Sequence, residues 1–317
     1  MEQRAKERSL RQRIGLALGQ PVTVAALVEA EQEGIEQVWA GQGGPSNPDV
    51  LTTLTAATAR TTRLHMGTAI IQAASRHPAF LAQQALALNN VAPGRIRLGL
   101  GTGFPARDRP VYGEQGNTPL AYLREYLQVL YPLMRQGAVH HHGPVFTVDA
   151  ELSAPVSIPI LTSALGPRSF RLAGELADGA ITWMCPISYL VNTALPELEK
   201  GAVQAGRRRP PVVAHVPVLL TSDRSVALAA GRRALTFYTR SPYYRHMFSS
   251  AGFSTQEIEG LADSLVEKVF VYGDGARIKE RLQEILALGI DELVVSLSEI
   301  ADSVQERVHL IRLIGQL

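Results

Sequence analysis

The sequence predicts an α/β fold, a single (β/α)8 TIM barrel in which residues 1–317 form one domain. The first observation is a joint at Gly34, Gly179 and Gly289, where a helix rich in Ala, Leu and Glu ends on glycine and a strand begins within a few residues. This punctuation is typical of repeated βα units, because glycine readily takes the left-handed conformation that ends a helix. The second observation is that about eight apolar strands alternate with helices over roughly 300 residues, which favours a closed barrel over an open doubly wound sheet.

The elements are assigned in order from apolar runs for strands and from helical periodicity, with Asp or Pro at the start, for helices. We expect strands at 13–19, 35–41, 64–71, 95–101, 159–162, 180–184, 211–221 and 292–298. We expect helices at 22–34, 47–60, 77–91, 118–136, 167–177, 223–239 and 302–314. Because the strands are apolar throughout, we expect both of their faces to be buried.

Two insertions interrupt the repeat, one after the fourth strand and one after the seventh. Residues 138–159 alternate apolar and polar side chains around Gly143-Pro144, which predicts a small hairpin. Residues 241–272 contain a short helix near 255–262. We expect both insertions to lie beyond the C-terminal ends of the strands, where barrel enzymes carry lids and substrate contacts.

Composition limits the class of protein. Apolar residues make up 46% of the chain and charged residues 19%, which is typical of a globular protein, and no apolar run is long enough to span a membrane. The charged N-terminus does not resemble a secretory signal, and the one cysteine, Cys185, cannot form a disulfide within the chain, so we expect a cytoplasmic protein. A net charge of +2 gives no reason to expect a nucleic-acid partner.

The clearest candidate site lies in the strand, turn and helix from Pro159 to Trp183. Gly166-Pro167 starts a helix just beyond the end of a strand, so the free amide groups of that helix, with Ser163, Arg168 and Ser169 beside them, predict a phosphate-binding turn. The alternative is an ordinary βα turn that binds no ligand.

The remaining motifs give weaker indications of a functional site. The glycines of GLGTGF at 99–104 lack the direct passage into a helix of a dinucleotide fingerprint, because Pro105, Arg107, Asp108 and Pro110 intervene and we expect a long loop to follow. These glycines either let a flat ligand approach the strand end or form a tight turn. His140-His141-His142 cannot converge on one metal ion, because neighbours on a strand point to opposite faces, and we expect no metal site. Cys185 is expected to be an inert buried thiol. The run 243–246 either lines a substrate pocket or packs on the barrel rim, and Trp39 and Trp183 are either core or cofactor wall.

These segments together resemble the luciferase-like family of barrel oxidoreductases, which includes bacterial luciferase and F420-dependent methylenetetrahydromethanopterin reductase. Residues 68–103, TAIIQAASRHPAFLAQQALALNNVAPGRIRLGLGTG, are similar to the family's third to fourth strands, and residues 159–181, PILTSALGPRSFRLAGELADGAI, to its fifth βα unit. VWAGQ at 38–42 resembles the end of the second strand. The resemblance covers most of the chain to Trp183 and fades after Pro186.

The resemblance implies a cofactor ring across the barrel mouth, FMN or the deazaflavin F420. A non-prolyl cis peptide behind the ring would map to Ala69-Ile70, and Thr102 and Gly103 would border its other side. The cofactor-binding residues would be Ala69, Ile70, Thr102, Gly103, Ser163, Ala164, Leu165, Gly166, Pro167, Arg168 and Ser169. Gln42, Phe104 and Trp183 would line the reacting face.

Departures from the family pattern limit the activity that is expected. Relatives that oxidise sugar phosphates carry an acid and a histidine where this chain has Gln42 and Gly43, and a glutamate where it has Phe104. Bacterial luciferase, an FMN enzyme, has an arginine at the position of Thr102. The GTG turn at 101–103 and the stretch ALGPRSFRLAGELADG at 164–179 look closer to F420 users, so we favour F420 over FMN. The resulting hypothesis is an F420-dependent oxidoreductase that transfers a hydride between the deazaflavin and an unidentified small organic substrate, expected as a homodimer. The alternatives are an FMN-dependent monooxygenase and a non-catalytic barrel that binds a cofactor or only packs as an oligomer.

Overall fold

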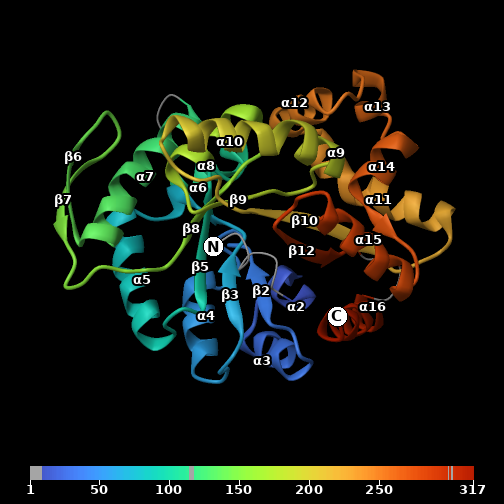
Figure 1. Ribbon diagram of the computed structural model, residues 1–317, viewed down its shortest axis with the longest axis horizontal. Helices are drawn as coiled ribbons and strands as arrows, with labels where there is room; N and C mark the ends of the chain where they lie inside the picture. Colours follow the sequence, from blue (N-terminus) through green and yellow to red (C-terminus); the bar gives the residue numbers. More distant parts are fainter. Residues whose placement is uncertain (1–8, 114–117, 299, 301–302) are drawn as a thin grey trace.

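The computed structural model describes residues 9–113, 118–298, 300 and 303–317 of the chain. Eight parallel strands follow one another round a sheet that closes on itself where β9 pairs with β10, which confirms the predicted barrel (Figure 1). In order round the barrel they are β1 (Ile14–Leu18), β2 (Gln37–Ala40), β3 (His65–Thr68), β5 (Ile96–Gly101), β8 (Ile160–Ser163), β9 (Gly179–Ile181), β10 (Val212–Leu219) and β12 (Glu292–Leu297).

Helices follow the strands as the sequence predicts, and several begin on an acidic N-cap. The Asp49 carboxylate accepts the Thr52 N–H at 2.9 Å, and Asp223 and Asp274 cap later helices in the same way. The helices are α2 (Leu10–Arg13), α3 (Val24–Gln32), α4 (Val50–Thr58), α5 (Pro78–Val91), α6 (Pro105–Tyr112), α7 (Pro119–Gln136), α8 (Pro167–Leu176), α9 (Ile187–Tyr189), α10 (Leu195–Gln204), α11 (Arg224–Thr239), α12 (Pro242–Ser250), α13 (Thr255–Glu259), α14 (Asp263–Val269), α15 (Gly275–Ala287) and α16 (Ser303–Gly315), with short 3-10 and π turns at Ala73–Ser75 and Leu190–Ala194. None of the helices in the described ranges is both long and apolar enough to cross a bilayer.

Two predicted strands differ in detail. The strand expected at 64–71 is divided into β3 and β4 (Ile71–Gln72), and the Ala69–Ile70 peptide bond between them is cis, as the resemblance implied. The strand expected at 180–184 already ends at Ile181, because the chain turns at Met184, whose φ is +53°.

The first insertion is the hairpin of β6 (Ala138–His142) and β7 (Thr147–Glu151), which Figure 1 shows at the outer edge of the molecule beside α7. The buried Glu125 carboxylate of α7 accepts the N–H groups of Val145 at 3.0 Å and Phe146 at 2.7 Å, so the tip is bound to the outside of the helix. No residue of 138–159 lines the pocket described below. The expectation that this hairpin lies over the barrel mouth was therefore wrong, because it leaves the C-terminal end of α7 and folds back along it.

The second insertion does reach the barrel mouth. It forms α12, α13, α14 and the short strand β11 (Val271–Tyr272), which pairs with β10 through Val271 and Val218. The start of α12 lines the pocket. Only the first residues of this insertion, within 241–246, line the pocket, and the rest of 241–272 is not among its lining residues.

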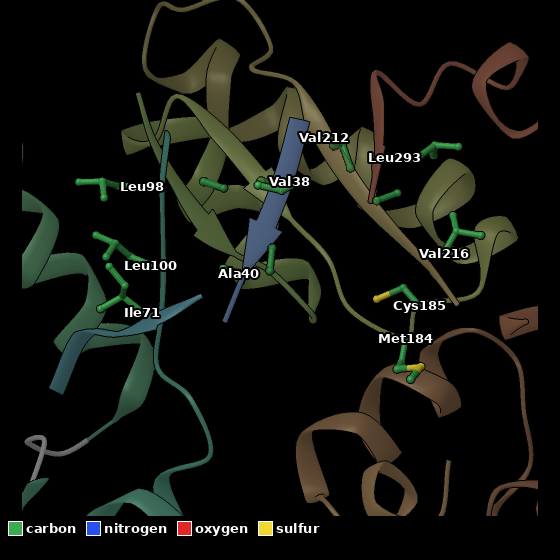
Figure 2. Packing of buried hydrophobic residues seen from close by; sticks show 14 of the residues in the cluster. Val38, Ala40, Ile71, Leu98, Leu100, Met184, Cys185, Val212, Val216 and Leu293 are labelled. Atoms are coloured by element: carbon green, nitrogen blue, oxygen red, sulfur yellow. The ribbon is translucent and has the colours of Figure 1, made fainter. Parts of the chain in front are cut away.

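The core has two layers. Side chains that point outward from the strands pack under the helices, and Figure 2 shows Leu98 and Leu100 of β5 gathered with Ile71. Side chains that point inward fill the barrel, namely Trp39, Leu161, Ile181, Val213 and Val294. Gly67 is required beside the indole, because a Cβ there would lie 2.4 Å from the Trp39 ring. The barrel is thus packed through its middle, which confines any ligand to its mouth.

Candidate active site

A pocket with a cavity volume of about 1160 Å³ opens at the C-terminal ends of the barrel strands. Its lining comes from the loops after β2, β3, β5, β8 and β9, from the first turns of α7 and α8, and from the α11–α12 corner. Active sites of barrel enzymes lie at this end, because the βα loops converge there. The position alone makes this pocket the candidate active site.

Every residue that the sequence analysis assigned to the site lines this pocket. They are Gln42, Ala69, Ile70, Thr102, Gly103, Phe104, Ser163, Ala164, Leu165, Gly166, Pro167, Arg168, Ser169 and Trp183. The structure thus brings together segments that are as far apart in sequence as residues 42 and 183. Their individual roles remain predictions.

The start of α8 offers the donors of an anion-binding turn. The Ser169 N–H and hydroxyl both donate to the Gly166 carbonyl, at 3.0 and 2.7 Å, and Pro167 has no N–H. Among the described residues, the Gly166 and Arg168 amides have no protein acceptor, and the Arg168 guanidinium is exposed and without an ion pair. A Cβ at Gly166 would meet nothing within 4 Å, so this residue borders open space. Two amides and one guanidinium, and not the whole run 166–169, are available to an anion.

Gln42 follows the end of β2 and is held there by backbone and side-chain contacts. Its backbone N–H donates to the Ile70 carbonyl at 2.9 Å, which joins the end of β2 to the cis peptide at Ala69–Ile70. Its side-chain oxygen accepts from Arg76 at 3.2 Å, and Arg76 also pairs with Asp49 at 2.6 Å. Among the described residues, the side-chain amide nitrogen of Gln42 has no protein partner.

The turn after β5 is shaped by a buried acid. Gly103 has φ +62°, and a Cβ there would lie 2.2 Å from the Asp108 carboxylate. That carboxylate accepts the Phe104 N–H at 2.7 Å and pairs with Arg107 at 2.8 Å. The sequence analysis expected a loop here, but Pro105 at the first position of α6 and Gly113 at its end delimit a helix.

Aromatic rings from three separate segments form one wall of the pocket. Phe104 lies parallel to Tyr244 with ring centroids 6.2 Å apart, and Tyr244 meets Tyr238 edge to face at 4.8 Å. The Trp183 indole N–H donates to the Tyr238 hydroxyl at 2.8 Å. The sequence analysis named Tyr244 as a possible pocket residue but missed Tyr238, which carries no local motif and is placed only by the packing of α11.

His215 lies beneath Trp183 and was also missed. The two rings are stacked, with centroids 3.5 Å apart and an interplanar angle of 8°. Burial lowers the pKa of His215 to about 3, so the imidazole is neutral. Its Nδ1 accepts the Met184 N–H at 3.3 Å, which leaves the proton on Nε2, 2.6 Å from the Ser296 hydroxyl. Strand alternation was the signal available in sequence, because His215 is two residues from the inward-facing Val213.

The charge of the lining is one-sided. Within the described residues it contains Arg107, Arg124, Arg168 and His246 and neither Asp nor Glu. Arg107 and Arg124 are partly neutralised by Asp108 and by Glu175, the latter at 2.7 Å. The pocket is therefore suited to an anionic ligand.

The other reactive residues lie elsewhere. His140 pairs with Asp149 at 2.7 Å and His141 with Glu125 at 3.2 Å, so neighbouring histidines of the hairpin point to different partners. Among the described residues, no group of three or more His, Cys, Asp or Glu side chains could hold a metal ion. Cys185 is buried, and burial raises the pKa of its thiol to about 12.

A closed (β/α)8 barrel with a large pocket at its mouth, walled by aromatic rings and edged by arginines, has the layout of a barrel enzyme. The chain belongs to the luciferase-like monooxygenase family, whose model matches residues 13–292. The match spans all eight barrel strands as far as the start of β12, and it confirms the family to which the sequence motifs pointed.

Similar proteins use two kinds of cofactor. The chain is 28% identical to a Mycobacterium tuberculosis protein named as a coenzyme F420-dependent oxidoreductase, over 90% of this chain and 94% of that protein. It is 26% identical to 5,10-methylenetetrahydromethanopterin reductase of Methanopyrus kandleri, over 87% of this chain and 88% of that protein.

Two solved structures share the fold. An F420-dependent secondary alcohol dehydrogenase with an F420-acetone adduct has a TM-score of 0.77, 22% identity and coverage of 96% and 97%. The oxygenating constituent of 3,6-diketocamphane monooxygenase from Pseudomonas putida, with FMN, has a TM-score of 0.71, 15% identity and coverage of 96% and 96%.

Proposed function

We propose that this protein is an F420-dependent oxidoreductase that transfers a hydride between the deazaflavin and a small organic substrate. The observation that carries the proposal is the α8 turn, which lines the pocket and where the Gly166 and Arg168 amides and the Arg168 guanidinium have no protein partner among the described residues. These donors suit a phosphate, and a helix N-terminus adds its dipole. The names of the two relatives aligned over most of the chain support F420 as the cofactor whose phosphate would bind there.

The rest of the pocket supports a flat ring beside this turn. Ala69 and Ile70 follow β3, Thr102 and Gly103 follow the neighbouring strand β5, and all four residues line the pocket. Phe104, Trp183 and Gln42 would face the reacting side of the ring. The deazaflavin supplies or accepts the hydride when it is bound, while the protein holds the ring, orients the substrate and limits access of water.

The alternative function is an FMN-dependent monooxygenase, which the fold shared with an FMN enzyme favours. FMN also carries a phosphate that would suit the α8 turn, so the turn alone does not separate the two cofactors. The chemistry does, because reduced flavin reacts with oxygen in a monooxygenase whereas a hydride transfer consumes none.

The test is equilibrium binding followed by turnover. We expect full-length protein to bind F420 more tightly than FMN, as measured by quenching of cofactor fluorescence. We also expect reduced F420 to be oxidised by organic acceptors without oxygen uptake at an electrode. Tighter binding of FMN with oxygen uptake would support the monooxygenase instead, and failure to bind either cofactor would leave only the non-catalytic barrel.

We further propose a single-domain protein that acts as a homodimer in the cytoplasm on a small molecule, without nucleic acid. Several large apolar side chains of the described residues are exposed, including Phe80 at 66% and Val91 at 54%, both on α5. Burial of such side chains would favour association. Light scattering coupled to gel filtration would give the mass, and a mass of one chain would reject the dimer.

A further inference from the structure

The pocket contains an acid that the sequence analysis lacked. Among the described lining residues there is no carboxylic acid, and His246 and Tyr243 are exposed at the rim. The remaining phenols are Tyr238 and Tyr244. The serine and threonine hydroxyls of the lining are far weaker acids than a phenol. A proton for a substrate bound inside the pocket must therefore come from one of these two tyrosines or from water.

The hydrogen bond from Trp183 leaves the hydroxyl proton of Tyr238 unused. An indole nitrogen can only donate, so the Tyr238 oxygen accepts at 2.8 Å and its own hydrogen remains available. No other partner of this hydroxyl is recorded in the described residues, and Tyr238 lines the pocket. Trp183 is in turn held flat on His215, at 3.5 Å. The stack and the hydrogen bond fix the phenol while leaving its O–H for a ligand.

Tyr238 and Tyr244 differ in how well their anions are stabilised. Burial raises the pKa of both groups. At Tyr238 the Trp183 N–H and the charge of Arg107 oppose this rise. At Tyr244 the neighbouring Tyr238 and Cys185 add to it. A proton donor must become an anion during the reaction, so the environment of Tyr238 suits that role and the environment of Tyr244 does not.

We infer that Tyr238 is the proton donor of this pocket and that the substrate is an uncharged carbonyl compound, an inference that rests on the proposed hydride transfer. In the reduction, a hydride from the reduced deazaflavin forms the new C–H bond at the carbonyl carbon. The electron pair of the C=O π bond moves to oxygen, which takes the Tyr238 proton. The phenolate then regains a proton from water, and the product is an alcohol.

The class of substrate follows from charge and from the donor. A positively charged acceptor such as an iminium would be repelled by the arginines of the lining and would need no proton on reduction. A ketone or aldehyde is neutral, fits beside the rings of Phe104, Trp183 and Tyr244, and forms an alkoxide unless an acid is present. Tyr238 supplies that acid.

The first measurement needs no substrate. In full-length 15N-labelled protein, the Trp183 indole N–H signal should shift in Tyr238→Phe and stay in place in Tyr272→Phe, which removes a hydroxyl outside the pocket. Raising the pH through the Tyr238 ionisation should move the same signal further downfield. If neither Tyr238→Phe nor the rise in pH moves the Trp183 indole signal, the inference is overturned, whether or not any cofactor binds.

The second measurement uses protein loaded with reduced F420 and a panel of cyclohexanone, acetophenone and cyclohex-2-enone. We expect kcat of Tyr238→Phe to fall by about 100-fold or more, while KM and the F420 dissociation constant change by no more than about threefold. Tyr244→Phe removes the other phenol of the pocket and should lower kcat much less than Tyr238→Phe does, while Tyr272→Phe, which lies outside the pocket, should keep the wild-type kcat. With 3-fluorotyrosine at position 238, a more acidic phenol, the alkaline limb of the pH profile should move to lower pH.

Each contrary outcome has a separate meaning. Full activity of Tyr238→Phe, or a loss confined to Tyr244→Phe, would overturn the assignment of the donor. Wild-type protein that binds F420 but reduces none of the carbonyls would overturn the substrate class and leave the proposed cofactor intact. Wild-type protein that does not bind F420 would reject the proposed function, and the indole signal would still report whether Tyr238 is paired with Trp183.

Discussion

The imidazole of His215 lies flat against the indole of Trp183, with ring centroids 3.5 Å apart and planes within 8°. His215 is on β10 and faces into the barrel, where its two nitrogens are used by the Met184 N–H and the Ser296 hydroxyl. The buried His215 thus supports Trp183, which lines the pocket, from below. The orientation of Trp183 therefore depends on the barrel interior and on the charge state of one buried histidine.

The neutral state of His215 predicts an acid-sensitive fold. Its pKa is about 3 in the folded protein and about 6.5 when unfolded. Between these values the unfolded chain binds the extra proton, so the free energy of unfolding should fall as the pH falls, by up to about 1.4 kcal/mol per pH unit. Urea denaturation at pH 7 and pH 4.5 should show a loss that is smaller by about 2 to 3 kcal/mol in His215→Asn. His140→Asn, which removes an exposed histidine, is the control. Equal losses in wild type and His215→Asn would contradict the prediction.

The turn after β5 predicts a strict requirement for glycine. Gly103→Ala places a Cβ where φ is +62° and 2.2 Å from the Asp108 carboxylate, so the turn must open and the bond from Phe104 N–H must weaken. Gly94→Ala is the matched control, because φ is +74° there and nothing lies within 4 Å. We expect Gly94→Ala to cost about 1 to 2 kcal/mol and Gly103→Ala clearly more, by thermal or urea unfolding. Equal costs would show that the Asp108 contact is unimportant.

Local patterns were sufficient to predict the barrel and the turn at the start of α8 that lines the pocket. The glycine joints and the alternation of elements act over a few residues, and Gly34 and Gly289 do have the left-handed φ of +87° and +92° that ends a helix. The α8 turn was predicted for the same reason, because Gly166-Pro167 marks both a strand end and a helix start. The third joint was wrong in detail, because α8 ends at Leu176 and Gly179 is the first residue of β9. Helix α6 was missed although Pro105 and Gly113 mark its ends, since Pro110 within it argued against a helix.

The aromatic wall could not be predicted in this way. Tyr238 and Trp183 are 55 residues apart, and nothing in either neighbourhood specifies that the indole and the phenol will meet. For the hairpin, the strands were predicted correctly but their position was not. Its strands were predicted from alternation, but its position depends on Glu125 and the amides of Val145 and Phe146, which is a contact between elements. Contacts of this kind follow from the closed barrel and not from sequence periodicity.

Arg168 predicts a specific loss of cofactor affinity. Its guanidinium has no ion pair among the described residues and lies beside the free amides of α8, so Arg168→Gln removes one charge from the proposed phosphate site. We expect the dissociation constant of F420 to rise about 10- to 100-fold, the range for a charge-assisted hydrogen bond, and to become less dependent on salt. Arg208→Gln removes an equal charge from an exposed loop and should leave the affinity unchanged. Similar affinities for both variants would place the phosphate elsewhere.

Glu125 tests whether the hairpin is structural or belongs to the active site. Burial alone would raise the pKa of this carboxyl, but the N–H groups of Phe146 and Val145 and the neighbouring His141 outweigh burial and keep the pKa below its usual range. The carboxylate is therefore charged at neutral pH and binds the hairpin tip to α7. Glu125→Gln removes the charge and one acceptor oxygen at nearly constant shape.

We expect Glu125→Gln to lower the free energy of unfolding by about 1 to 3 kcal/mol, because buried amides lose a charged acceptor. Glu199→Gln, which changes an exposed glutamate of α10, should cost almost nothing. Since no hairpin residue lines the pocket, both variants should bind F420 like the wild type at a temperature where both are folded. Hydrogen exchange should become faster at Val145 and Phe146 alone. A loss of cofactor affinity in Glu125→Gln with unchanged stability would mean that the hairpin acts on the barrel mouth after all.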